Sequence, residues 1–384
     1  MKRAIIIICI AGMLPLEGCG WPVHSREVEQ LQLIQTLGCD VRGDGVTVSA
    51  SSGPQPGGGE GVRLAAGGES IPAAIRNLQH WSAREELFFS HVRYAVLGED
   101  AARRGAGPLL DYFERSTQTP MNLPLLVVRG GTARELVTAS EDPDYEATVL
   151  LASLQRDTER MGTAHCFSVL DVARRLSRSG AALCCAVAAR EPGGNVPSAG
   201  EGALPVVEAG YAVLREGRLA GFLNADESLG TDLLLGLAGA ARYVLPRDEG
   251  TVTVELRSAE AALTPRWDPD TGIVLDAELQ VRAGVIHSDG ADPGADGVLP
   301  ELEQALARAV QLQAEAALEA SRTLEADFLE LAALTERKAG GLPRGARAAG
   351  GFPPLTWQVR VQASVERSYD VYGAVPIAGE EAAP

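Results

Sequence analysis

The pattern of hydrophobic residues changes at a Gly- and Pro-rich stretch that spans residues 190–203. Before this stretch, short apolar segments alternate with amphipathic helical segments, which is typical of an α/β domain whose helices cover the sheet. After it, longer alternating segments and one long helical pattern predict an α+β arrangement. The sequence therefore predicts a mixed fold, α/β and then α+β, in two or three domains.

The 384 residues are enough for several domains with substantial cores, at about 100–200 residues per domain. We expect an N-terminal α/β domain over residues 19–189, a linker over 190–203 and a small β-rich middle domain over 204–258. A C-terminal α+β domain would follow over 259–384. Apolar residues at spacings of three and four predict one long helix over 299–338, unless it breaks near Ser321.

Local signals predict several elements of the N-terminal domain. Gly and Asp at 43–45 predict the turn of a hairpin, since both tolerate positive φ. Ser70 is typical of an N-cap, with Pro72 in the first turn of the helix that follows. Glu99 and Asp100 come directly before a short helix, where carboxylates favour the helix dipole.

The N-terminus is typical of an exported protein. Lys2 and Arg3 precede the 13 uncharged residues 4–16, too few for a membrane-spanning helix, which needs about 20. Leu16-Glu17-Gly18-Cys19 resembles the lipobox of bacterial lipoproteins, in which the Cys thiol receives a diacylglyceryl group and the chain is cut before it. We therefore expect a lipoprotein signal peptide over 1–18 and lipidation of Cys19; the alternative is an ordinary secretory signal.

The net charge limits the possible partners. It is −17, and it becomes −18 once Lys2, Arg3 and Glu17 leave with the signal peptide. Such a chain is unsuited to nucleic acid, which requires clustered Lys and Arg. It is also unsuited to docking on anionic lipid through a polybasic patch, so membrane attachment would depend on the lipid at Cys19 and on protein partners.

No motif of enzyme chemistry is evident. The sequence has no G-x-S-x-G nucleophile elbow and no H-E-x-x-H metal motif. The acidic residues Asp289, Asp292 and Asp296 lack EF-hand spacing, and Glu303 and Asp327 are expected on the solvated face of the long helix. Five histidines are scattered over different elements: His24, His80, His91, His165 and His287. We therefore predict no catalytic residue, no cofactor and no metal site.

The cysteines of the exported chain also indicate structure rather than chemistry. Cys184 and Cys185 are neighbours in an apolar, strand-like run, so their side chains should point to opposite faces. With Cys39 and Cys166 they make only four thiols, too few for a disulfide framework. We expect buried structural thiols.

Several segments, in order, resemble the Ger(x)C family of spore germination lipoproteins, the C subunits of nutrient germinant receptors. After the lipobox, residues 21–40 resemble the family's opening block, and residues 90–102, with Gly98-Glu99, resemble its "sH.k.iiiGE.lA" block. Further matches are Leu109-Leu-Asp-Tyr-Phe-Glu-Arg, Gly210-Tyr-Ala-Val-Leu, Leu219-Ala-Gly-Phe-Leu with Glu227, Leu302-Glu303, Ala326-Asp327-Phe328 and Trp357.

This resemblance implies a mixed α/β ectodomain without known catalysis, carrying lipid such as palmitate at Cys19. It would lie on the outer face of the spore inner membrane and act with two integral membrane subunits as a scaffold or coupling component. An alternative class is a solute-binding lipoprotein of a transport system, which would have two similar lobes. A third class, a lipid-anchored hydrolase, is disfavoured by the missing motifs.

Overall fold

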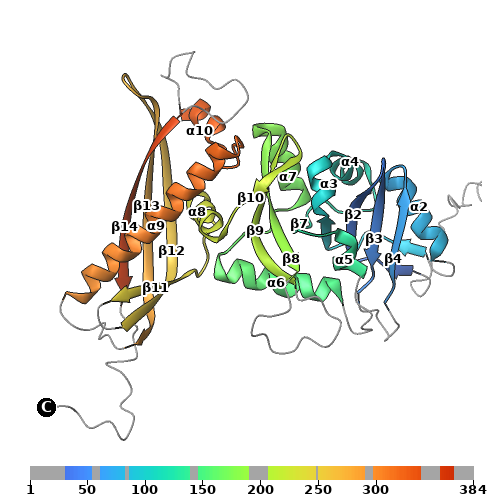
Figure 1. The fold of residues 1–384 in the computed structure, drawn as a ribbon, viewed down its shortest axis with the longest axis horizontal. Coiled ribbons are helices and arrows are strands. Elements are labelled where there is room, and N and C mark those ends of the chain that lie inside the picture. The colour runs from blue at the N-terminus through green and yellow to red at the C-terminus, as the bar shows by residue number, and fades with distance from the viewer. Residues whose placement is uncertain are drawn as a thin grey trace, which may run out of the picture.

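A computed structural model describes residues 31–53, 61–82, 86–138, 146–189, 206–247, 250–289, 297–338 and 355–366. Two halves lie side by side along the long axis of the molecule (Figure 1). The first half contains an eight-stranded sheet with helices around it, and the second contains a four-stranded sheet crossed by one long helix. The predicted mixed fold class is confirmed.

The eight-stranded sheet has the order β10-β9-β8-β7-β6-β2-β3-β4. Its four central strands, β2, β6, β7 and β8, are parallel to one another, and the strands at both sides pair antiparallel. The parallel strands are buried almost throughout, which is why they appear in the sequence as continuous apolar runs. The strands are β2 (Thr36–Arg42), β3 (Gly45–Ser51), β4 (Arg63–Gly68), β6 (Tyr94–Leu97), β7 (Leu125–Arg129), β8 (Ala181–Ala189), β9 (Val206–Arg215) and β10 (Arg218–Phe222).

A separate parallel pair, β1 (Leu31–Leu33) and β5 (Glu86–Phe88), lies where the described chain begins. The helices of this half are α2 (Ile71–Trp81), α3 (Glu99–Arg104), α4 (Gly107–Arg115), α5 (Ala133–Thr138), α6 (Ala147–Met161) and α7 (Val169–Ser179). The Ser70 hydroxyl accepts a hydrogen bond from the Ala73 N–H, so the predicted N-cap is confirmed. A capping box, in which Ser168 and Asp171 bond each other's backbone N–H groups, starts α7.

The second half is built on a long hairpin. Strands β12 and β13 pair along almost their whole length, β11 joins one edge antiparallel, and β14 joins the other edge parallel. One face of this sheet packs against α8 and α9, and Figure 1 shows α9 crossing it diagonally. The elements are α8 (Ala225–Leu235), β11 (Arg242–Arg247), β12 (Gly250–Asp268), β13 (Gly272–Asp289), α9 (Val298–Thr323), α10 (Leu331–Lys338) and β14 (Leu355–Glu366).

The predicted middle domain over 204–258 is wrong. Strands β9 and β10 complete the first sheet, whereas β11 and β12 belong to the second. Residues 190–203 lie outside the described residues, but they connect β8 to β9, which are neighbouring antiparallel strands of one sheet. A Gly- and Pro-rich composition is shared by hairpin loops and domain linkers, so it did not distinguish them. The chain passes between the two halves after β10 instead.

The predicted single helix over 299–338 is also wrong. Helix α9 ends at Thr323, and α10 starts only at Leu331. The break falls close to Ser321, the alternative that the sequence left open. The seven residues 324–330 between the two helices, here called the junction turn, lie where the two halves meet.

Candidate functional site at the junction of the two halves

The junction turn departs from helical geometry at two non-glycine residues. Glu325 has a φ of 48° and Glu330 a φ of 56°, both in the left-handed region. Each such residue costs about 1 kcal/mol or more and persists only where surrounding contacts hold it, and such residues cluster at functional sites. The contacts that hold this turn therefore identify the junction as the candidate site.

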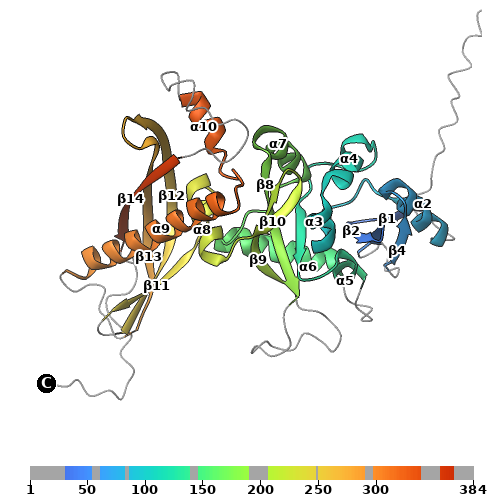
Figure 2. The same cartoon turned by 45° about the horizontal axis from the view of Figure 1, so that its top comes forward.

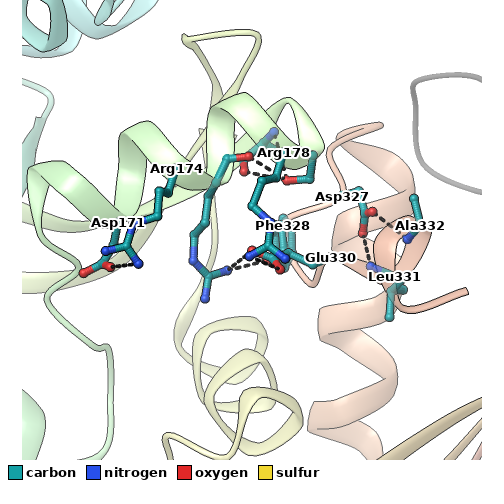
Figure 3. Close-up of polar contacts among 11 residues, drawn as sticks. Asp171, Arg174, Arg178, Asp327, Phe328, Glu330, Leu331 and Ala332 are labelled. Atoms are coloured by element: carbon teal, nitrogen blue, oxygen red, sulfur yellow. Dashed lines mark hydrogen bonds and ion pairs between the residues drawn. The ribbon is translucent and has the colours of Figure 1, made fainter. Parts of the chain in front are cut away.

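Contacts within the second half fix one side of the turn. The Ser321 hydroxyl donates a hydrogen bond to the Ala326 carbonyl at 2.7 Å. The Asp327 carboxylate accepts hydrogen bonds from the N–H groups of Leu331 at 2.7 Å and Ala332 at 2.8 Å, and so caps α10 (Figure 3). Burial raises the pKa of Asp327, while the two backbone hydrogen bonds oppose that rise. Asp327 is only 2% exposed, so its prediction as a solvated helix residue is wrong.

Arginines of α7, in the first half, hold the other side. Arg175 donates a hydrogen bond to the Phe328 carbonyl at 3.2 Å and lies 3.8 Å from the Glu330 carboxylate. Arg178 approaches the other oxygen of Glu330 at 3.9 Å. Figure 3 shows the side chains of Arg178 and Glu330 directed at each other. The Arg175 guanidinium also lies over the ring of Phe167, 4.6 Å from its centroid, a cation–π contact.

The Phe328 side chain is fully buried. Burying a phenylalanine side chain stabilises a fold by about 1.5–3 kcal/mol relative to leaving it exposed. Because the Phe328 carbonyl is bonded to α7, this residue links the junction turn to a helix of the first half. Figure 2 shows α7 and α10 facing each other across the junction.

The last two strands on one side of the first sheet, β9 and β10, make a second contact with the turn. Arg215, at the end of β9, forms an ion pair with Glu325 at 2.8 Å and also bonds the Leu324 carbonyl at 3.4 Å. On β10, a Cβ at Gly221 would lie 2.9 Å from a methyl group of Leu324. The absence of a side chain at Gly221 therefore lets Leu324 approach the strand.

A buried pair forms the inner part of the junction. The Tyr211 hydroxyl, on β9, donates a hydrogen bond to the Asp232 carboxylate, on α8, at 2.5 Å, and accepts one from the His165 N–H. Asp232 is 1% exposed, and burial raises its pKa to about 7, although the Tyr211 hydrogen bond opposes the rise. Tyr211 also lies beside Phe167, at 6.1 Å between ring centroids, so the inner pair and the Arg175 contact share one neighbour.

A glycine positions α8 for this pair. A Cβ at Gly230 would lie 1.8 Å from the Gln313 carbonyl oxygen of α9, so the two helices touch backbone to backbone. Asp232 follows two residues later and reaches Tyr211 from this fixed helix. The junction is thus a set of charged and polar contacts that joins the two halves into one body.

The residues singled out in the sequence fall elsewhere. Cys19 lies outside the described residues, as do His24, Asp292 and Asp296. Glu99 opens α3 and accepts a hydrogen bond from the Gly130 N–H, which lowers its pKa against the effect of burial. Glu303 accepts a hydrogen bond from the Val365 N–H, so it joins α9 to β14 rather than pointing only to solvent.

The cysteine interpretation is confirmed for the described chain. Cys39, Cys166, Cys184 and Cys185 are all buried and free of disulfides. Burial raises the pKa of both the Cys39 and the Cys184 thiols to about 12, so they stay protonated and unreactive.

Sequence reasoning did not find the junction. One signal was present: an Asp four residues before the apolar run that starts α10 is typical of a helix N-terminus. The arginines of α7 gave no signal, because their partners lie about 150 residues away. Within the described ranges, no group of three or more His, Cys, Asp or Glu side chains could hold a metal ion, and no helix is long and apolar enough to cross a membrane.

Fold and site together define a two-domain α/β protein whose two halves are joined by hydrogen bonds and ion pairs at the junction. Residues 24–188 match the family described as "Spore germination protein N-terminal domain", and residues 209–368 match "Spore germination B3/ GerAC like, C-terminal". These matches span most of the chain, which therefore belongs to the GerAC-like, or Ger(x)C, family of spore germination proteins.

Two relatives agree with this assignment. The chain is 24% identical to YfkR of Bacillus subtilis (strain 168), whose name assigns it to spore germination, over 68% of this chain and 70% of YfkR. The crystal structure of the GerBC protein has the same fold, with a TM-score of 0.57 and 12% identity over 86% of this chain and 96% of GerBC. The family is one of germinant receptor subunits.

Proposed function

We propose that this protein is a non-catalytic, lipid-anchored subunit of a spore nutrient germinant receptor. It acts with two integral membrane subunits, as a scaffold or coupling component, on the outer face of the spore inner membrane. Membership of the family across both halves is the observation that carries the proposal. The anchor is the diacylglyceryl group on Cys19, in the Leu-Glu-Gly-Cys sequence at 16–19.

The contacts at the junction support a role as a scaffold or coupling component. A subunit that transmits or supports a conformational change needs its parts joined firmly, because a coupling free energy is lost in a freely hinged molecule. Here Arg175, Arg178 and Arg215 connect the first half to the junction turn, and Tyr211 connects it to α8. The two halves therefore act as one body.

A solute-binding lipoprotein of a transport system is the weaker candidate. Proteins of that class capture a ligand between two similar lobes. This chain has unlike halves, with eight strands in one sheet and four in the other, and Arg175, Arg178 and Arg215 join them at the junction turn.

Deletion of the gene tests the receptor role. In a spore former that lacks the gene, germination should fail in response to the nutrient that this receptor serves and persist for nutrients served by other receptors. Spores are scored with one nutrient at a time, first in the otherwise unaltered strain and then in a strain from which parallel receptors have been removed. Unchanged germination with every nutrient in that strain would refute the proposal.

Substitution of the lipidated residue tests the anchor. Cys19→Ala should leave the protein folded but release it from the membrane fraction, and it should impair nutrient-triggered germination. Retention of the Cys19→Ala protein in the membrane fraction, at the level of the unaltered protein, would refute lipid anchoring at this residue.

A further inference from the structure

The end of the molecule where the described chain begins carries an unusually exposed tryptophan. Trp81, the last residue of α2, is 74% exposed, more than any other large apolar side chain in the described residues. Singly exposed apolar residues are common on protein surfaces, so this exposure makes Trp81 available for a contact outside the chain, and its surroundings decide whether one is indicated. An indole with an apolar ring and one N–H donor is suited to the boundary between lipid and water.

Trp81 lies at the edge of an open hollow lined by both polar and apolar residues. The hollow has a volume of about 420 Å³ and lies between α2 and the ends of β2, β3 and β4. Arg42, Asn77 and His80 line it together with Trp81. These side chains offer hydrogen-bond donors beside an aromatic ring, which suits phosphate and carbonyl groups of a lipid headgroup layer.

The tether to Cys19 leaves the chain at this same end. Leu31 pairs with Glu86, which follows Trp81 by five residues, and the Leu87 N–H bonds the Gln79 side chain of α2 at 2.8 Å. Cys19 precedes Leu31 by 12 residues, which span at most about 40 Å when extended. Figure 1 places α2 at the opposite end of the molecule from the second half.

The local charge permits such an approach. Residues 31–93 contain five arginines and six carboxylates, a net charge of −1 in a chain of −17. One of those carboxylates, Asp40, is buried and bonded to the N–H groups of Ala133 and Arg134. Most of the negative charge, which an anionic membrane repels, therefore lies in the rest of the molecule.

We propose that the surface formed by Asn77, His80 and Trp81 of α2 with Arg42 of β2, here called the α2 face, rests on the bilayer, with the Trp81 ring in the headgroup region. This inference rests on the proposed lipid anchor at Cys19. The second half then points away from the membrane surface, and the long hairpin of β12 and β13 is available to other proteins. Two attachments, the lipid and the α2 face, fix the orientation that one tether would leave free.

Tryptophan fluorescence in vesicles tests the contact. The lipidated full-length protein is placed in vesicles of equal parts phosphatidylglycerol and phosphatidylethanolamine, with or without headgroup spin-labelled lipid. Trp21, Trp267 and Trp357 are changed to Phe, so that Trp81 is the one remaining tryptophan. The Trp81 emission should shift to shorter wavelength on vesicles, and the spin label should quench it.

A matched variant retains Trp267 instead of Trp81. Trp267 is also exposed, at 44%, but lies near the tip of the long hairpin in the second half. We expect at least twofold stronger quenching of Trp81 than of Trp267. If the triple variants do not fold, the protein with only Trp21→Phe serves as the reference, since Trp21 lies beside the lipidated Cys19, and adding Trp81→Phe to it should remove its quenched component.

Co-sedimentation with the vesicles separates the two possible failures. Protein that sediments with the vesicles while Trp81 and Trp267 are quenched equally would overturn the α2 contact and leave the anchor standing. Protein that does not sediment with the vesicles would overturn the anchor, and the α2 contact with it.

Discussion

At the scale of single residues, Arg175 makes several different contacts at the junction. It bonds the Phe328 carbonyl, pairs with Glu330 and lies over Phe167, and its side chain is only 19% exposed. Its neighbour Arg174 is 61% exposed, and its ion pair, with Asp171 at 3.9 Å, lies within α7 itself. The two arginines share a helix and a charge, but only one of them reaches the second half.

This difference predicts the effect of removing each side chain. Arg175→Ala should lower the free energy of unfolding by about 2–3 kcal/mol, because a charged hydrogen bond and a cation–π contact are lost together. Arg174→Ala should change it by less than about 0.5 kcal/mol. Urea unfolding of both variants measures this, and equal losses would contradict the role given to Arg175.

Asp232 makes the stability of the junction depend on pH. Burial raises its pKa from the ordinary 3.8 to about 7, so the folded protein holds this proton more tightly than the unfolded chain. Its contribution to stability is complete below about pH 4 and is lost as the pH rises through 7. Loss of the proton leaves a buried carboxylate whose one hydrogen-bond partner in the described residues is Tyr211.

Asp232→Asn should remove this dependence, since the amide keeps the size and an acceptor for Tyr211 but does not ionise. The unfolding free energy of the unaltered protein should fall between pH 4 and 8 by on the order of a few kcal/mol more than that of the variant. Parallel pH profiles of the two proteins would contradict the assignment.

At the scale of elements, the interruption between α9 and α10 is the feature that sequence patterns left open. Leu324, Phe328 and Leu331 keep helical spacing, so the apolar pattern continues where the helix does not. The contacts with the α7 arginines on one side of the break lie in no local window, whereas the Asp327 cap on the other side is local. Helices with local capping signals, such as α2 after Ser70, were predicted well.

The cap predicts a local effect on α10. Asp327→Ala should leave the N–H groups of Leu331 and Ala332 without their buried acceptor and cost about 2 kcal/mol. Hydrogen exchange in residues 331–338 should accelerate, whereas exchange in α2 should stay unchanged. Asp327→Asn keeps one acceptor oxygen, so its exchange rates in α10 should lie between those of the unaltered protein and those of Asp327→Ala. Protection of α10 that is unchanged by the Ala substitution would contradict the cap.

At the scale of the whole molecule, the sequence predicted the two kinds of sheet but misplaced the boundary between them. The change of pattern near residue 200 is real, yet β9 and β10 follow it and still belong to the first sheet. Register and strand order are set by contacts between distant residues, as where β8 pairs with β9 across residues 190–205. Composition could not decide whether that loop joins strands or domains.

The same contacts explain why the junction could not be predicted. Arg215 meets Glu325, and Tyr211 meets Asp232, only after both halves have folded. The family resemblance of segments along the chain, by contrast, needed no spatial information, and the family matches over residues 24–188 and 209–368 confirm it.

The most direct test of the central claim is a purification from spores. Tagged protein, solubilised with mild detergent from spore inner membranes, should bring down two multi-span membrane proteins in comparable amounts, and the Cys19→Ala protein should be absent from that membrane fraction. Recovery of the tagged protein without any multi-span partner, or with a transport ATPase and its permease instead, would contradict its role as a germinant receptor subunit.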